Sequence, residues 1–197
     1  MSFNIAIDGP AGAGKSTIAK KIAKELGFVY VDTGAMYRAM ALYFLRSNIS
    51  NEDEQAISRA SENVEITIQY ENGEQQVFLN GENVSGEIRK EEVGNMASKT
   101  SGYGQVRKKL VELQQQLAKK ADVVMDGRDI GTVVLPDAQV KVYLTASVAT
   151  RAKRRYDELS EKGQECNLEK IEADIEQRDY QDMHRSIAPL KQAEDAV

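Results

Sequence analysis

The sequence predicts an α/β protein in which helices cover an open parallel sheet. The first observation is an apolar run at residues 3–8, which a glycine-rich turn follows at once. The second is a helical pattern over residues 15–26, and the third is another apolar run at residues 28–32. Strand, helix and strand within about 30 residues form the parallel βαβ unit from which such sheets are built.

The helical pattern after the first strand is well marked. Its apolar residues recur three and four positions apart, at Ile18, Ala19, Ile22, Ala23 and Leu26. Gly27 follows, where a helix commonly ends in the left-handed conformation that glycine adopts at little cost. After the second strand, a further helix is expected near residues 35–46.

The middle of the chain has a different pattern. Apolar and polar residues alternate as in a half-exposed strand, with apolar side chains at Val64, Ile66, Ile68 and Tyr70. Asn72-Gly73 and Asn80-Gly81 are strong hairpin turns, because asparagine and glycine tolerate positive φ. Residues 63 to about 86 are therefore predicted to form a small antiparallel three-stranded insert.

Helices and strands alternate again after the insert. The helical pattern resumes near Lys90, and apolar runs at 122–126 and 140–145 predict two more strands of the parallel sheet. Two highly charged helices are expected near 147–162 and 168–186.

Composition limits the class of protein. The 197 residues are 41% hydrophobic and 29% charged, which fits a globular protein with one sizeable core. The net charge of −5 argues against nucleic acid or an anionic membrane as a partner. No run approaches the roughly 18 apolar residues of a membrane helix, the first residues lack the features of a secretory signal, and the lone Cys166 excludes an intramolecular disulfide. We expect a cytoplasmic monomer.

Residues 9–16 fit the pattern G-x-x-x-x-G-K-[ST] and stand between a strand and a helix, as that motif requires. Glycines let backbone N–H groups turn inward around phosphates, and the helix N-terminus adds a positive dipole. Lys15 is expected to reach the β- and γ-phosphates, and the Ser16 hydroxyl to bind Mg²⁺. The motif predicts the P-loop NTPase fold and an ATP site at Gly9, Pro10, Ala11, Gly12, Ala13, Gly14, Lys15, Ser16 and Thr17.

Asp126 is a second candidate metal ligand, because it ends the apolar run that begins at Asp122. Ligands in open α/β sheets bind outside the carboxyl ends of the strands, so Asp126 is placed to hold Mg²⁺ directly or through water. Without the phosphate loop, Asp126 would be interpreted as an aspartate that merely ends a strand at a turn.

Arginines stand at positions that suit an anion site. Arg178, Asp182 and Arg185 share one face of the last predicted helix, being spaced i, i+4 and i+7. The other candidates are Arg38, Arg107, Arg128, Arg151, Arg154 and Arg155. Each alone could belong to a solvated helix face or an i,i+4 ion pair, above all the last three. Phosphoryl transfer between two anionic molecules, however, requires several guanidinium groups to neutralise charge and align donor with acceptor.

Four blocks closely resemble the bacterial cytidylate kinases and stand in that family's order. They are residues 9–16, Asp32-Thr33-Gly34-Ala35-Met36-Tyr37-Arg38, Asp126-Gly127-Arg128-Asp129-Ile130-Gly131-Thr132, and Arg178-Asp179 with Arg185-Ser186-Ile187-Ala188-Pro189-Leu190. The blocks span nearly the whole chain, and the insert matches the longer bacterial form. The resemblance implies a nucleoside monophosphate kinase that transfers the γ-phosphoryl group of ATP to CMP or dCMP, with Mg²⁺ as cofactor.

The resemblance also implies roles at matching positions. The CMP site would consist of Thr33, Tyr37, Arg38, Ser98, Arg107, Arg128, Asp129, Arg178, Asp182 and Arg185. The residues that recognise cytosine would be Ser98, Arg107 and Asp129, and those on the CMP phosphate would be Arg38 and Arg128. The catalytic group would be Lys15, Arg128 and Arg178, and the metal ligands Ser16 and Asp126.

The family pattern divides the single kinase domain, residues 1–197, into functional regions. They would be a core of 1–32, 122–146 and 167–197, an NMP-binding region of 33–121, and a mobile lid of 147–166. Within the lid, Arg151 and Arg155 would bind ATP. Family members continue beyond the position of Val197 with a further strand and helix, so we expect that strand to be missing or partial here.

Cytosine recognition can also be derived from chemistry. Cytosine offers its N4 amino group as a donor and N3 and O2 as acceptors, so a carboxylate can accept from N4 while arginine and serine donate to the other atoms. Uracil has a carbonyl oxygen in place of N4, and Asp129 would face its lone pairs. The other interpretation of Asp129 is an ion pair with a neighbouring arginine, which could coexist with binding.

Three other functions fit part of the sequence. The nearest is a kinase of the same fold that acts on UMP, AMP or a small metabolite. A nucleotide-binding switch is disfavoured because the chain has no N-K-x-D guanine motif and a switch gains nothing from so many acceptor-side arginines. A structural relic of a phosphate loop would have no reason to keep Lys15, Ser16 and Asp126 together.

Overall fold

The computed structural model describes residues 2–197, which form two separate sheets. The larger sheet has four parallel strands in the order β2-β6-β1-β7. Their bounds are β1 Asn4–Asp8, β2 Val29–Asp32, β6 Val123–Gly127 and β7 Val140–Tyr143. The predicted open parallel sheet is therefore confirmed, with β2 at one edge.

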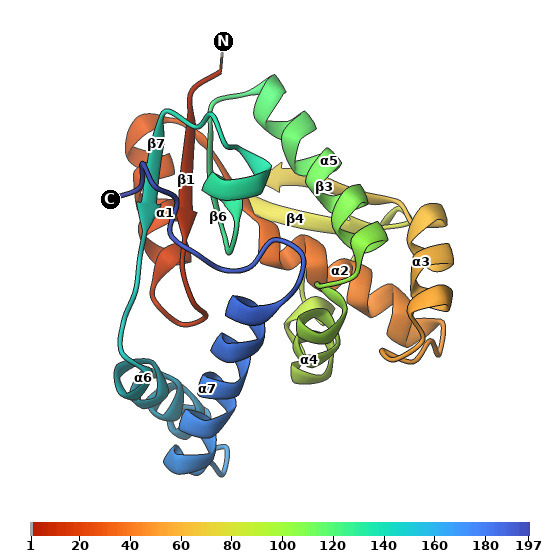
Figure 1. Ribbon diagram of the computed structural model, residues 1–197, viewed down its shortest axis with the longest axis vertical. Helices are drawn as coiled ribbons and strands as arrows, with labels where there is room; N and C mark the ends of the chain where they lie inside the picture. Colours follow the sequence, from red (N-terminus) through yellow and green to blue (C-terminus); the bar gives the residue numbers. More distant parts are fainter. Residues whose placement is uncertain (1) are drawn as a thin grey trace.

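The described chain has seven α-helices in addition to the two sheets (Figure 1). They are α1 Lys15–Leu26, α2 Thr33–Arg46, α3 Glu54–Asn63, α4 Glu91–Thr100, α5 Gly104–Lys120, α6 Val148–Glu161 and α7 Leu168–His184. In Figure 1, α6 and α7 lie side by side and project beyond the ends of the strands. None of the helices in residues 2–197 is both long and apolar enough to cross a membrane.

The parallel sheet is covered on both faces, which explains its continuous apolar runs. On one face, Ile5, Ile7 and Val124 pack against Ala19 and Ala23 of α1. On the other face the sheet contributes to a larger core that includes α2, α4, α5 and the insert, with Ala6, Val31, Met36, Met40, Phe44 and Met125 among its buried side chains.

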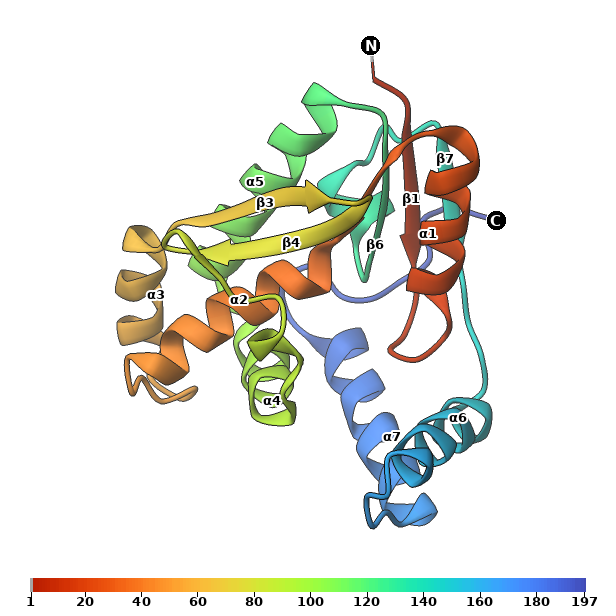
Figure 2. The same cartoon turned by 180° about the vertical axis from the view of Figure 1, so that it is seen from behind.

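The antiparallel insert has the three strands that the turns predict: β3 Ile66–Glu71, β4 Glu74–Leu79 and β5 Glu82–Asn83. Both Asn-Gly turns have positive φ at each residue, 53° and 79° at Asn72 and Gly73 and 49° and 84° at Asn80 and Gly81. Such conformations suit two-residue hairpin loops, which is why these dipeptides locate the turns. Figure 2 shows the β3–β4 hairpin lying across α2, with its first turn toward the parallel sheet.

The structure differs from the sequence-based expectations at several boundaries. The helix expected near 35–46 begins two residues earlier, at Thr33, because the Asp32 carboxylate caps it by accepting from the Ala35 N–H at 3.0 Å. Helix α3 and a π-helical segment, Ile130–Val134, were not predicted. At the end of the chain the structure fits the expected partial strand, because Val197 pairs with the outer edge of β7: its N–H donates to the Lys141 carbonyl at 3.1 Å, and its carbonyl accepts from the Tyr143 N–H at 2.7 Å.

Candidate active site

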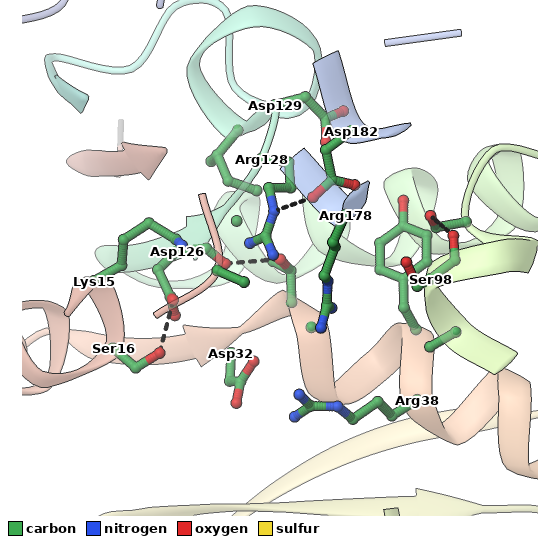
Figure 3. Close-up of a pocket in the computed structure, with 18 of the residues that line it drawn as sticks. Lys15, Ser16, Asp32, Arg38, Ser98, Asp126, Arg128, Asp129, Arg178 and Asp182 are labelled. Carbon is green, nitrogen blue, oxygen red and sulfur yellow. Dashed lines mark hydrogen bonds and ion pairs between the residues drawn. The ribbon is translucent and has the colours of Figure 1, made fainter. Parts of the chain in front are cut away.

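A polar cavity of about 220 Å³ opens at the carboxyl ends of the parallel strands. The phosphate loop, the start of α2, the end of β6 and parts of α4, α5 and α7 line it (Figure 3). It brings together most of the predicted site residues, namely Ala11, Gly12, Lys15, Ser16, Thr33, Tyr37, Arg38, Ser98, Arg107, Asp126, Arg128, Asp129, Arg178, Asp182 and Arg185. The remaining ones, Gly9, Pro10, Ala13, Gly14, Thr17, Arg151 and Arg155, are not in its lining.

The phosphate loop has the backbone that its glycines allow. Gly9 has φ 144°, and a Cβ there would lie 1.9 Å from the Leu144 carbonyl oxygen, so only glycine fits at this position. The loop leads directly into α1, whose first residue is Lys15. Successive inward N–H groups at a helix N-terminus form a site for anions.

The Lys15 side chain is buried beneath this loop. Its ammonium donates to the Pro10 carbonyl at 2.8 Å. Burial, together with the nearby Arg128 charge, lowers the pKa of Lys15 to about 7. A lysine in this state gains a strong partner when an anion enters the cavity, because phosphate oxygens stabilise its charged form.

Ser16 and Asp126 meet at the end of β6, where the place of Asp126 at the end of an apolar run predicts a ligand of Mg²⁺. The Ser16 hydroxyl donates to the Asp126 carboxylate at 2.9 Å, and the Tyr30 hydroxyl donates to its other oxygen at 2.8 Å. Burial and the neighbouring Asp32 charge raise the pKa of Asp126. The sequence reasoning missed Tyr30, and its position on the neighbouring strand, two residues before Asp32, is the only signal that could have found it.

The Asp129 carboxylate is buried and is bound by two arginines. One carboxylate oxygen accepts from Arg107 of α5 in a buried contact, and the other accepts from Arg185 at 3.3 Å. Burial raises the pKa of the Asp129 carboxyl, and the surrounding arginines, Arg107 first, oppose that shift. The ion pair considered for Asp129 is thus present, while Asp129 also lines the cavity.

Two arginines point into the cavity with no bonded partner among residues 2–197. No hydrogen bond or ion pair of the described structure involves the guanidinium of Arg38 or Arg178, and the buried Nε of Arg178 has no acceptor. Figure 3 shows both side chains, with Arg128 and Lys15, around the same space. Arg128 itself donates to Asp182 at 2.8 Å. Leaving the buried Nε of Arg178 without an acceptor is costly, and an anion in the cavity would supply that acceptor.

Tyr37 and Ser98 line the cavity near this arginine cluster. The Tyr37 hydroxyl is buried without a hydrogen-bond partner, and burial raises its pKa to about 12. The Arg107 guanidinium lies 5.7 Å from the centre of the Tyr37 ring. Helix α4 supplies Ser98, which is half-buried.

The three arginines of α6 lie in different environments. Arg151 is buried, pairs with Asp179 of α7 through both carboxylate oxygens at 3.0 and 2.5 Å, and donates to the Ala11 carbonyl at 3.2 Å. Arg155 is exposed and pairs with Glu158 at 3.0 Å, the helix-surface arrangement considered for it. Arg154 reaches the Gly12 carbonyl at 3.5 Å. Arg151 and Arg154 therefore contact the phosphate loop, whereas Arg155 does not.

The sequence reasoning also missed Asp8, at the end of β1. Its two carboxylate oxygens accept from the N–H groups of Ile130 and Gly131, each at 2.7 Å, and so start the π-helical segment that follows Asp129. Burial raises the pKa of Asp8 to about 6. Asp8 could have been found from its position at the end of a strand beside the glycine-rich turn. The same argument from a strand end identified Asp126.

Most of the chain is similar in sequence to proteins of one known family. The sequence model described as cytidylate kinase matches residues 5–197. The cytidylate kinase of Lactobacillus johnsonii is 54% identical over 99% of this chain and 85% of its own, and that of Caldicellulosiruptor saccharolyticus is 53% identical over 99% and 86%. A shikimate kinase from Acinetobacter baumannii in complex with shikimate is a distant structural neighbour, 20% identical over 92% of this chain and 78% of its own, with a TM-score of 0.40. The chain belongs to the cytidylate kinase family.

Proposed function

We propose that this protein transfers the γ-phosphoryl group of ATP to CMP or dCMP, giving ADP and CDP or dCDP. One observation carries the proposal: the phosphate loop and the guanidinium groups of Arg38 and Arg178 line the same cavity, and neither guanidinium has a bonded partner among residues 2–197. Such a cavity suits two anionic substrates that meet head to head. The names and high identity of the relatives support cytidine as the acceptor nucleoside.

Charge placement would supply most of the catalysis. Phosphoryl transfer places negative charge on oxygens that the protein must neutralise, and it needs donor and acceptor in line. The Lys15 ammonium would release the Pro10 carbonyl and bind a phosphate oxygen of ATP instead. Arg128 and Arg178 would bind oxygens of the phosphoryl group that is transferred. The acceptor is already a phosphate oxyanion, so no general base is required.

The acceptor nucleotide would bind on the side formed by α2, α4, α5 and α7. Arg38 and Arg128 would hold its phosphate, with Thr33 and Tyr37 beside them and Asp182 and Arg185 at the sugar and phosphate. Ser98, Arg107 and Asp129 would recognise the cytosine edge. Because Arg107 and Arg185 already orient the Asp129 carboxylate, it would accept from N4 without reorganisation.

Mg²⁺ is proposed to accompany ATP, with Ser16 and Asp126 as its protein ligands. Their adjacent oxygens, 2.9 Å apart, suit a hard cation that keeps most of its coordination for phosphate and water. No cluster of three or more histidine, cysteine or acidic side chains in the described residues offers a protein-only metal cage. When bound, Mg²⁺ would neutralise charge on the phosphates.

We propose that the chain has the three functional regions that the sequence predicts. The core would hold ATP, residues 33–121 would bind the acceptor, and residues 147–166 would form a lid that adds Arg151 and Arg155 to the ATP site. The contacts of Arg151 and Arg154 with the phosphate loop support the first part of that lid. With a net charge of −5, a cytoplasmic monomer that acts on small molecules rather than nucleic acid is proposed.

A coupled assay of ADP formation with CMP, dCMP, UMP and AMP tests the proposal. We expect CMP and dCMP to be the best acceptors and ADP formation to require one of them. A preference for AMP or UMP would instead support the alternative kinase on this fold. ATP hydrolysis that CMP does not stimulate would support a slow NTP-hydrolysing switch.

A further inference from the structure

One face of the β3–β4 hairpin is apolar along most of its length and polar at its turn end. Its inward cross-strand pairs are Ile66 with Leu79, Ile68 with Val77 and Tyr70 with Gln75. Val77 and Leu79 are buried in the main core, as the alternation of a half-buried sheet requires. Tyr70 and Gln75 form the last inward pair before the Asn72-Gly73 turn, where an apolar pair would continue the pattern.

These two side chains bind the backbone of β2, the edge strand of the parallel sheet. The Gln75 amide accepts from the Asp32 N–H at 2.8 Å and donates to the Asp32 carbonyl at 3.2 Å. The Tyr70 hydroxyl donates to the Tyr30 carbonyl at 2.9 Å. Tyr30 and Asp32 are two residues apart, so both present their backbone groups to the open edge of the strand. The hairpin thus completes this edge through side chains.

Asp32 is the residue at which β2 becomes α2. Its carboxylate caps α2 through the Ala35 N–H, and it lines the cavity. The next residue, Thr33, donates to the Asp126 carbonyl at 2.7 Å, which joins the start of α2 to the end of β6. Arg38 follows on the second turn of α2 and points into the cavity (Figure 3).

We propose that Gln75, assisted by Tyr70, is a positioning residue for the acceptor half of the site. By clamping both backbone groups of Asp32, it sets the direction in which α2 leaves the sheet, and with it the place of Thr33 and Arg38. The insert would then act on the acceptor phosphate without touching it. This inference rests on the proposed CMP kinase activity.

A purely structural role for the Gln75 contacts predicts a different outcome. If they only held the insert to the domain, their loss would lower stability and affect both substrates alike. If they position α2, the loss should fall on the acceptor, because the phosphate loop and Lys15 belong to other elements. The Michaelis constants for CMP and ATP, measured separately, distinguish the two roles.

The decisive experiment compares Gln75→Ala with Gln76→Ala. Gln76 is the next residue of β4, faces the other side and accepts only from Asn83 at 3.3 Å, so it is a matched control. At a temperature well below both melting temperatures, we expect Gln75→Ala to raise the KM for CMP about tenfold, since small misplacements of a binding group are costly. The KM for ATP should stay within about twofold, and Gln76→Ala should behave as the unmodified protein.

Two further variants show which contact matters. Gln75→Glu keeps an acceptor for the Asp32 N–H but sets a carboxylate against the Asp32 carbonyl, so it should fail to restore the KM for CMP. Tyr70→Phe removes one hydrogen bond while keeping the ring, so it should fold and give a smaller rise of the same kind.

The inference is overturned if Gln75→Ala leaves the KM for CMP unchanged, shifts both KM values equally, or matches Gln76→Ala. Hydrogen exchange gives a second readout: residues 32–38 should exchange faster in Gln75→Ala than in Gln76→Ala. If the unmodified protein does not phosphorylate CMP, the proposed function fails, and the exchange of residues 32–38 alone decides whether Gln75 positions α2.

Discussion

The Arg107 guanidinium and the Asp129 carboxylate form an ion pair inside the protein, although they lie 22 positions apart in the chain. Their side chains are only 5% and 6% exposed, and Arg185 holds the second carboxylate oxygen at 3.3 Å. A buried carboxylate fixed by two guanidinium groups has a defined direction for any further bond. The pairing is therefore compatible both with base recognition by Asp129 and with a role limited to holding the arginines.

Asp129→Ala separates these two roles. If Asp129 accepts the cytosine N4 proton, the unmodified enzyme should prefer CMP over UMP strongly, because a polar site left unpaired discriminates by several orders of magnitude. The substitution should then collapse the CMP:UMP ratio of kcat/KM, mainly through lost CMP activity, while the KM for ATP changes little. Equal losses for CMP and UMP would show that Asp129 only orients arginines.

The same substitution should also reduce stability, because it leaves Arg107 buried without its partner. We expect the free energy of unfolding to fall by about 3 kcal/mol in Asp129→Ala. Asp129→Asn, which keeps the shape and one acceptor, should lose less. Denaturant titration of both variants gives the stability, so that kinetic comparisons can be made where each variant is folded.

Lys15→Ala should abolish phosphoryl transfer while the fold stays intact. One positive charge on the transferring group supplies several kcal/mol of transition-state stabilisation, which is worth at least about a thousandfold in kcat. Lys24→Ala, an exposed lysine at the other end of α1, is the matched control and should keep full activity. Retention of even about a tenth of the original kcat by Lys15→Ala would argue against contact with the phosphates.

Stability should depend on pH through Asp8. Burial raises its pKa from 3.8 to about 6 in the folded protein, so the folded state holds the proton more strongly than the unfolded chain. Its contribution is therefore fully present below the unfolded pKa and is lost as pH rises through about 6. The free energy of unfolding should therefore fall by about 2–3 kcal/mol between pH 4 and 7.

Asp8→Asn should remove this dependence. Relative to the unmodified protein, its free energy of unfolding should improve as pH rises from 4 to 7, even though an amide accepts less well from the Ile130 and Gly131 N–H groups. Asp137→Asn, at an exposed position, controls for the loss of one carboxylate. Parallel pH profiles for Asp8→Asn and the unmodified protein would contradict the assignment to Asp8.

Nucleotide should change the mobility of the lid. Arg151 and Arg154 contact carbonyls of the phosphate loop, and phosphates entering that loop offer them stronger, charged acceptors. Hydrogen exchange over residues 151–165 should therefore slow when ATP and CMP, or a bisubstrate analogue, are added. Helix α3 lies away from the lid and serves as the internal control (Figure 1). Unchanged protection near 151–165 would count against a mobile lid.

The sequence by itself determined the features that depend on short-range chemistry. The phosphate loop, the first βαβ unit and both Asn-Gly turns follow from residues a few positions apart, because backbone conformation at glycine and asparagine is a local property. Helix α3 was not predicted because it has only ten residues and Ile57 is its one large apolar side chain. The helical turn at Thr33 was placed two residues too late, since its cap is the side chain of the strand residue Asp32.

Only the tertiary structure decided which arginine side chains remain free to bind an anion. Arg128 bonds Asp182 across 54 positions, and Arg151 bonds Asp179 across 28, whereas Arg38 and Arg178 keep no bonded partner among residues 2–197. Nothing in the local sequence distinguishes these four arginines. A guanidinium is paired or free according to which acidic side chain another element brings within about 3 Å, and that distance exists only once the helices have packed.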